Sequence, residues 1–306
     1  MGDLIHTLPA ATALKQAHPD ALLTWVVEPK WMPLLSQNPF VDRIVPLQRD
    51  SLGGLLATRR ELRESKYDFA VDFQGLIKSV AVAFAAKPGR IYGFEQVRES
   101  LARTLYDQRI AATATHVVDR NLELAVAAGA VRGNPVIFPL PTGEPEGELP
   151  DGNFVLASPL AGWASKQWPM AHYRILAQRL REELGIPLVL NGAPASNFEA
   201  VDAAVTHYSG LPGLIDATRR ASAVLGVDSG PMHLAAALGK PGVAIFGPTD
   251  PARNGPYGGT IRVLRTDAAV TTYKRGTAID ESMQQISPDQ VFEALRTVLY
   301  PARCSA

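Results

Sequence analysis

Short apolar runs alternate with longer segments in which apolar residues recur at helical spacing along most of the chain. This alternation is typical of β-α-β units built around a parallel sheet. In the first half it predicts strands at residues 22–27, 43–45, 69–73 and 90–92, and helices at residues 4–17, 54–65, 76–86, 97–106 and 116–128. In the second half it predicts strands at residues 154–157, 187–190, 223–227 and 243–246, and helices at residues 172–184, 214–221, 232–238 and 288–299.

A segment rich in proline, glycine and glutamate, residues 131–150, interrupts the alternation and shows no period. Such composition is typical of a linker. We therefore expect an α/β protein of two doubly wound domains, residues 1–150 (with the linker) and residues 151–306. The last helix, residues 288–299, is a candidate to pack back on the first domain. Because ligands of such sheets bind beyond the carboxyl ends of the strands, we expect a cleft between the domains.

The chain opens with Gly2 and Asp3 directly before a helix, without the strand that normally leads into such a turn. We therefore expect the first strand of the amino-terminal domain to be missing. A carboxylate at Asp3 would then be poorly anchored, and a loosely held catalytic group loses the advantage of proximity.

Composition excludes several classes of protein. Thirty basic and thirty acidic residues balance to zero net charge, which gives no support to a nucleic-acid-binding protein. The single cysteine, Cys304, allows neither a disulfide framework nor a thiolate metal site. No apolar run approaches the roughly 20 residues that span a bilayer, and no signal peptide opens the chain. We expect a cytoplasmic enzyme or binding protein.

The stretch VDSGPMHLAAALGKPGVAIFGPTD, residues 227–250, places a polar turn between a buried strand and a short helix. Pro231 suits the first helical turn, where a backbone N–H has no partner to lose. The amides of Gly230, Met232 and His233 lie at the helix N-terminus, where the macrodipole favours an anion. Since Gly230 also lacks a Cβ, a phosphate can approach the backbone. The stretch predicts a diphosphate-binding site.

Two polar residues of this turn have alternative roles. Asp228 would repel a phosphate, so we assign it to the hydroxyl groups of a sugar. Asp228 or Ser229 could equally serve only as the cap of the helix.

A second polar loop, SPLAGWASKQWP (residues 158–169), follows the first predicted strand of the second domain. Lys166 is a candidate to neutralise a diphosphate, with Trp168 packing the loop down, although a single loop lysine is commonly only solvated. We include Ser158 and Gly162 of this loop in the candidate donor site. The NGAP turn that starts at Asn191 belongs to the same rim.

Four stretches resemble the ADP-heptose:lipopolysaccharide heptosyltransferases, particularly the heptosyltransferase I type: GDLIHTLPAATALK, YDFAVDFQGLIKSVAVAFAAKPGRIYGF, SKQWP and VDSGPMHLAAALGKPGVAIFGPTDP. They follow the family's order over nearly the whole chain, and the last is the most specific. The NGAP turn matches less well, because Pro194 stands where relatives often carry an acidic residue. This departure puts recognition of adenosine at that turn in doubt.

The resemblance implies a GT-B glycosyltransferase, with two Rossmann-like domains facing a cleft and an inverting reaction. The amino-terminal domain would bind the acceptor and the carboxyl-terminal domain the nucleotide-sugar. No cofactor or protein-bound metal is implied, and the chain contains no Asp-x-Asp sequence. Carried over by position, Asp3 would be the general base and Lys166 the partner of the diphosphate. The donor-sugar and phosphate clamp would comprise Asp228, Ser229, Gly230 and His233, to which we add Pro231 and Met232.

The resemblance also implies transfer of L-glycero-D-manno-heptose to a Kdo residue of the lipopolysaccharide inner core, on lipid A. For this anionic acceptor we select Lys78, Arg98 and Arg60, although the alternating charges around Arg60 also suit a solvated helix face. We expect a cytoplasmic protein, peripheral at the inner membrane, and a monomer.

Two alternatives remain open. Another GT-B enzyme would use a different nucleotide-sugar, because the sequence does not reveal which base the rim loops select. A nucleotide-binding protein would be inactive because its first strand is absent. A nicotinamide-dependent dehydrogenase has less support, since neither half shows Gly-x-Gly-x-x-Gly after a first strand.

Overall fold

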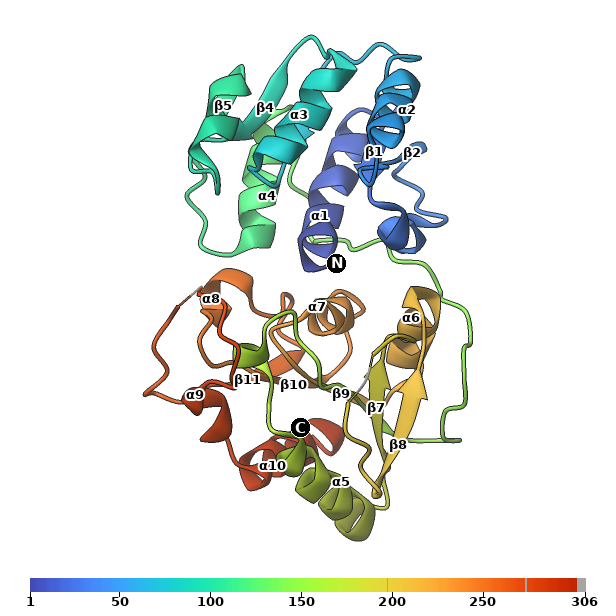
Figure 1. The fold of residues 1–306 in the computed structure, drawn as a ribbon, viewed down its shortest axis with the longest axis vertical. Helices are drawn as coiled ribbons and strands as arrows, with labels where there is room; N and C mark the ends of the chain where they lie inside the picture. The colour runs from blue at the N-terminus through green and yellow to red at the C-terminus, as the bar shows by residue number, and fades with distance from the viewer. Residues whose placement is uncertain (197, 273, 302–306) are drawn as a thin grey trace. The chain divides into compact units, whose positions relative to one another are not determined.

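A computed structural model describes residues 1–196, 198–272 and 274–301 of the chain (Figure 1). The chain forms two compact units. The amino-terminal unit comprises residues 3–141, and the carboxyl-terminal unit comprises residues 142–306 together with Met1 and Gly2.

The carboxyl-terminal unit is built on one parallel sheet of six strands, in the order β11-β10-β9-β6-β7-β8. The strands are β6 (Val155–Ser158), β7 (Leu188–Gly192), β8 (Ala204–Tyr208), β9 (Ala223–Val227), β10 (Gly242–Ile245) and β11 (Ile261–Leu264). The predicted strands form the centre of the sheet. The pattern missed both edge strands, β8 and β11, because each is partly exposed and lacks a continuous apolar run.

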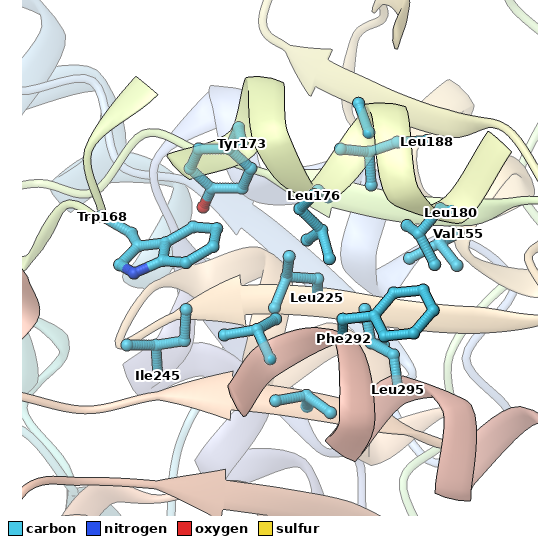
Figure 2. Close-up of a cluster of buried hydrophobic side chains, with 14 of the residues drawn as sticks. Val155, Trp168, Tyr173, Leu176, Leu180, Leu188, Leu225, Ile245, Phe292 and Leu295 are labelled. Carbon is cyan, nitrogen blue, oxygen red and sulfur yellow. The ribbon is translucent and has the colours of Figure 1, made fainter. Parts of the chain in front are cut away.

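Helices cover this sheet and close its core. They are α5 (Met170–Leu184), α6 (Leu211–Arg220), α7 (Gly230–Ala237), α8 (Pro251–Asn254), α9 (Glu281–Gln284) and α10 (Pro288–Leu299), with a 3-10 turn η3 (Ala164–Lys166). Figure 2 shows side chains of α5 and α10 meeting those of the strands in one cluster. Trp168 is buried there, and its indole N–H donates to the carbonyl of Ile286 at 2.8 Å. It anchors the loop after β6 as predicted.

The last helix, α10, packs within the carboxyl-terminal unit. Ser287 caps it and forms a capping box with Gln290. Phe292 and Leu295 on its inner face are buried in the same cluster as α5 and β10. The sequence makes this helix a candidate to pack on the first domain, whereas the structure buries its apolar face against α5, β9 and β10 of its own unit.

The second half of the linker is anchored to the carboxyl-terminal unit. The Glu146 carboxylate accepts hydrogen bonds from the amides of Gly210 and Gly213, at 2.5 and 3.2 Å, and so caps α6, whose own N-cap residue has no side chain. His207 holds the backbone carbonyl of Glu146 at 2.6 Å. A segment without secondary structure is thereby held in place by hydrogen bonds.

The amino-terminal unit contains two separate parallel sheets. Its elements are α1 (Gly2–Ala17), β1 (Thr24–Val27), a 3-10 helix η1 (Pro29–Leu35), β2 (Arg43–Pro46), α2 (Leu52–Leu62), β3 (Ala70–Asp72), α3 (Ile77–Ala86), β4 (Ile91–Phe94), a 3-10 helix η2 (Ser100–Leu105), β5 (Gln108–Ile110) and α4 (Val117–Ala127). Strand β1 pairs with β2, and β4 lies between β3 and β5. Where the sequence predicts a helix over residues 97–106, the structure has only the 3-10 helix η2. The sequence pattern missed β5, because this strand is short and mostly exposed.

Strands β1 and β3 each keep one unpaired edge, since no strand among the described residues joins the two sheets. Trp25 and Val26 of β1 and Ala70 and Val71 of β3 are only partly buried, whereas every residue of β6, β9 and β10 is buried. We call this interruption between the sheet of β1 and β2 and the sheet of β3, β4 and β5 the sheet gap.

No helix within the described ranges is long and apolar enough to cross a membrane.

The sheet gap predicts uneven protection from hydrogen exchange. Backbone amides on the unpaired edges of β1 and β3 lack a strand partner among the described residues, so we expect them to exchange about a hundredfold faster than the amides of β6 and β9. Amide exchange followed by mass spectrometry or NMR measures this difference, with β4, which is paired on both sides, as the internal control. Equal protection of β3 and β4 would contradict a free edge.

Candidate functional site

The candidate donor site begins where the strand order of the carboxyl-terminal sheet reverses. Strand β6 pairs with β7 on one side and with β9 on the other, and Ser158 lies opposite Gly226 in the register. All these strands are parallel, so the loops that follow β6 and β9 leave the same edge of the sheet side by side. This reversal is the position where doubly wound sheets bind their ligands.

These two loops bring Lys166 and Asp228 together. The Lys166 ammonium donates to Oδ2 of Asp228 at 2.5 Å, across 62 positions of sequence. Nε2 of His233, from the first turn of α7, lies 3.6 Å from Oδ1 of the same carboxylate. The side chains of Lys166, Asp228 and His233 are 15%, 8% and 7% exposed, so the pair is largely removed from water.

The environment of Asp228 fixes its charge. Burial alone would raise the pKa of its carboxyl, but the neighbouring His233 ring and the Lys166 ammonium outweigh burial and hold that pKa below its ordinary value. Asp228 is therefore ionised at neutral pH. The sequence suggested that Asp228 faces a sugar and Lys166 a diphosphate, but it did not indicate that the two side chains pair. Since the ammonium carries three N–H groups, Lys166 retains donors for a further oxygen.

The N-terminus of α7 presents unpaired amides beside this ion pair. Ser229 occupies the N-cap position, yet its hydroxyl makes no capping bond and is buried without a hydrogen-bond partner among the described residues. The first bond of the helix runs from the His233 amide to the carbonyl of Ser229. The amides of Gly230 and Met232 precede that bond, and Pro231 between them has none. Two backbone donors are thus available for an anion.

An aromatic ring links two cations at this rim. The Lys166 ammonium lies 4.2 Å from the centre of the Trp163 ring, and the guanidinium of Arg275 lies 5.8 Å from the same centre. The segment that carries Arg275 is tied to the loop after β6, because the amide of Asp280 donates to the carbonyl of Ser165. Arg275 was not predicted, since it stands in a loop without periodicity after a missed strand.

The remaining predicted donor residues divide between packing and exposure. Ser158 and Met232 are buried, and the Met232 side chain lies so close to Gly226 that a Cβ there would overlap it. Gly162 is exposed in the loop after β6, with open space around its α-carbon. Oδ1 of Asn191 accepts from the Ser209 hydroxyl at 3.0 Å and contacts the His207 ring at 2.8 Å. Asn191 therefore braces the ends of β7 and β8.

In the amino-terminal unit, the candidate base Asp3 pairs with Arg98. Two guanidinium nitrogens of Arg98 donate to the two carboxylate oxygens of Asp3, at 3.1 and 3.3 Å. Each side chain is 51% exposed, so solvent reaches the pair. This fork geometry orients the carboxylate at the first turn of α1. The sequence selected both residues separately, one as the base and one for the acceptor.

The two other candidates for the acceptor, Lys78 and Arg60, are exposed on α3 and α2. The turn before Lys78 is fixed by the buried Asp72, which the sequence did not single out. Asp72 accepts hydrogen bonds from the hydroxyls of Tyr106 and Ser79, at 2.6 and 2.9 Å. Burial and this bond raise the pKa of the Tyr106 phenol, so that Tyr106 remains a donor.

No group of three or more histidine, cysteine, aspartate or glutamate side chains within the described part of the chain is arranged to hold a metal ion.

The fold and this site define a GT-B glycosyltransferase. The structure superimposes on the Escherichia coli heptosyltransferase WaaC with ADP at a TM-score of 0.78 and 26% identity, covering 97% of this chain and 96% of that chain. The structure of the same enzyme with ADP-2-deoxy-2-fluoro heptose gives a TM-score of 0.77 and 27% identity, with the same coverage.

Sequence comparison defines the family. Residues 55–281 match glycosyltransferase family 9 (heptosyltransferase). Lipopolysaccharide heptosyltransferase 1 of Escherichia coli K12 is 32% identical over 298 residues, covering 87% of this chain and 90% of that protein. Lipopolysaccharide heptosyltransferase 2 of the same organism is 30% identical over 339 residues, with 98% and 96% covered. The chain therefore belongs to glycosyltransferase family 9, and it is a transferase.

A double-mutant cycle measures the coupling of Lys166 and Asp228. We expect Lys166→Met to destabilise the protein by about 3–5 kcal/mol, because it leaves a buried carboxylate without its cation. The double variant with Asp228→Asn should lose about 1–3 kcal/mol less than the sum of the single variants, as measured by urea denaturation.

The stability that Asp228 contributes should also depend on pH. Because the pKa of Asp228 is lowered in the folded protein, the stability it contributes is present above the unfolded pKa of about 3.9 and declines as the pH falls below that value. The difference between wild type and Asp228→Asn should therefore shrink on acidification below about pH 4. A difference that stays constant from pH 7 to pH 3 would contradict an ionised, paired Asp228.

Proposed function

We propose that this transferase moves L-glycero-D-manno-heptose from ADP-heptose to a Kdo residue of the lipopolysaccharide inner core, with inversion at the anomeric carbon. Membership in the family and relatives named as lipopolysaccharide heptosyltransferases support this reaction. The observation that carries the proposal is the Lys166–Asp228 pair beside the free amides of α7. It forms an anion site at the strand reversal of a nucleotide-binding sheet.

The donor site suits a diphosphate flanked by a sugar. Lys166 and the amides of Gly230 and Met232 supply positive charge and hydrogen-bond donors for the phosphate oxygens. Arg275, whose guanidinium lies 5.8 Å from the centre of the Trp163 ring, adds a second cation beside this site. Asp228 holds Lys166 in place, and its remaining acceptor capacity faces sugar hydroxyls. With these groups in place the reaction needs no protein-bound metal.

A panel of nucleotides tests the donor. ADP should raise the melting temperature of the protein by several degrees at a concentration about 100 times its Kd, since a ligand that binds only the folded state adds about 2.7 kcal/mol at that excess. UDP and GDP at the same concentration should have little effect. Differential scanning fluorimetry measures all three, and Lys166→Met serves as the binding-deficient control. A preference for UDP or GDP would refute ADP-heptose as donor and leave the family intact.

The acceptor proton and the departing phosphate each have a candidate partner among the residues of this chain. The acceptor hydroxyl gives its proton to the Asp3 carboxylate while its oxygen attacks the anomeric carbon. The bond between that carbon and the β-phosphate oxygen breaks on the opposite face, so the configuration inverts and ADP leaves. Negative charge grows on the departing phosphate, where Lys166 and the amides of α7 stabilise it.

The acceptor is an anionic sugar, which accounts for the cations of the amino-terminal unit. In this proposal Arg98 contacts a carboxylate of the acceptor and also orients Asp3. Lys78 and Arg60, both exposed, contribute further positive charge. Relatives named lipopolysaccharide heptosyltransferase 1 and lipopolysaccharide heptosyltransferase 2 are similar to the chain to about the same degree, so another sugar of the lipopolysaccharide core is the second candidate acceptor. The reaction would take place in the cytoplasm, at the inner membrane.

Substitution of the base tests the mechanism. We expect Asp3→Asn to lower kcat by about 10²–10⁴-fold, the usual contribution of a general base, while the Kd for ADP stays within about twofold. Asp20→Asn, which removes an exposed carboxylate just after α1, controls for the change in charge. Transfer of radiolabelled or fluorescent heptose measures kcat, and calorimetry measures Kd.

Three outcomes of that experiment differ in meaning. Retained turnover in Asp3→Asn would remove Asp3 from the mechanism. Loss of ADP binding in the same variant would indicate a structural role instead. A wild-type protein that binds ADP but transfers nothing would favour a nucleotide-binding protein whose amino-terminal unit is disabled by the sheet gap.

A further inference from the structure

Helix α2 turns an apolar stripe toward solvent. Its inner face buries Thr58 and Leu62 against the unit. Leu52, Leu55 and Leu56 near its N-terminus are 82%, 43% and 62% exposed. Leu55 and Leu56 follow Leu52 by about one helical turn, so the three side chains lie near one another on the helix.

Two neighbouring elements also expose large apolar side chains. Ile77 and Phe84 lie on one side of α3 and are 45% and 62% exposed. Leu101 and Leu105 of η2 are 65% and 42% exposed. Helix α3 packs against both α2 and η2, and Figure 1 shows α2 and α3 in one layer of the unit. We call the exposed side of these three elements the α2–α3 face.

The apolar residues are concentrated here. Sixteen large apolar side chains are exposed in the described part of the chain, and seven of them belong to residues 52–105, less than a fifth of its length. Single exposed apolar residues are normal on a protein surface, whereas a contiguous group marks an interaction site.

Uncompensated cations border the same face. Arg59 and Arg60 follow the leucines of α2, and Lys78 and Lys87 lie at the two ends of α3. All four are exposed, and none forms an ion pair with any residue that the structure describes. The nearby carboxylates of Glu61 and Glu64 are already paired with Arg43, so they do not neutralise these cations.

We propose that the α2–α3 face docks the protein on the surface of an anionic lipid bilayer. Exposed leucine and phenylalanine side chains enter the boundary between headgroups and acyl chains, while arginine and lysine contact the lipid phosphates. Long basic side chains suit this arrangement, because their stems lie along apolar surface and their charges stay in water. The interaction goes beyond the proposed reaction, since it requires neither donor nor acceptor.

Charge complementarity selects a bilayer over a second copy of the chain. The cations around the leucines of one copy would meet the same cations of another, since a two-fold interface repeats the same patch on both sides. An anionic leaflet instead presents negative charge at every position and attracts juxtaposed basic residues. A face that combines apolar residues with unpaired cations is therefore matched by phospholipid.

Sedimentation with vesicles tests the proposal. The full chain should bind vesicles of phosphatidylcholine with 30% phosphatidylglycerol, bind pure phosphatidylcholine at least about tenfold less, and release as salt is raised. Arg59→Gln/Arg60→Gln should weaken binding by about fivefold for each charge removed. Leu52→Ser/Leu56→Ser should weaken it at least tenfold, because both apolar anchors are lost.

A matched control removes one exposed apolar residue and one exposed arginine elsewhere. Ile175→Ser/Arg181→Gln, on α5, should bind anionic vesicles like the wild type. Circular dichroism and the melting temperature of each variant establish that it is folded.

Two results would overturn the proposal. One is a wild-type protein that does not bind anionic vesicles, or binds them equally well with the face altered. The other is a dimer in analytical ultracentrifugation that Leu52→Ser/Leu56→Ser converts to monomer without any vesicle binding, which would assign the face to a second copy. Because the vesicles contain no lipopolysaccharide, these results do not depend on the proposed transfer.

Discussion

The adjacency of β6 and β9 is the constraint on which the candidate donor site depends. Because these parallel strands end at the same edge of the sheet, their loops bring a lysine and an aspartate from 62 positions apart into a 2.5 Å contact. The pairing offsets the free-energy cost of burying the Asp228 carboxylate, because a buried charge without a partner of opposite sign is strongly destabilising. Once satisfied, the pair fixes the ammonium next to the free amides of α7. Lys166 is thereby positioned before any ligand arrives.

The two units differ in how completely their parallel strands are paired and buried. In the carboxyl-terminal unit, central strands are buried along their whole length and every inner strand has two partners. In the amino-terminal unit, α1, β1 and η1 share one apolar cluster, while α3, β4 and η2 share another. The sheet gap separates their strands, so the backbone edges of β1 and β3 are not stabilised by a neighbour. Asp3 is held by the fork of Arg98, which stands 95 positions away in the sequence.

The cationic side chains of this protein occupy two different environments, one buried and paired and the other exposed. Lys166 is largely buried, paired and close to an aromatic ring, which suits a defined ligand group. Arg59, Arg60, Lys78 and Lys87 are exposed, lie beside apolar side chains and are free of ion pairs within the described residues. Such mobile cations act through the field of an extended surface, whereas a buried lysine acts through a short, directed contact.

The sequence by itself determined the α/β class, the order of the elements and the turn at residues 227–233, because apolar periodicity and the residues Gly230 and Pro231 act through local backbone preferences. It also selected Asp3, Lys166, Asp228 and Arg98 through chemistry and family resemblance. Edge strands such as β8 and β11 escaped prediction, since their partial exposure removes the periodic signal. Only the tertiary structure decided that Lys166 pairs with Asp228, that Arg98 pairs with Asp3, that Arg275 lies by Trp163 and that the leucines of α2 face solvent. Each of these depends on how segments that are distant in the sequence pack against one another, and local backbone preferences do not encode that packing.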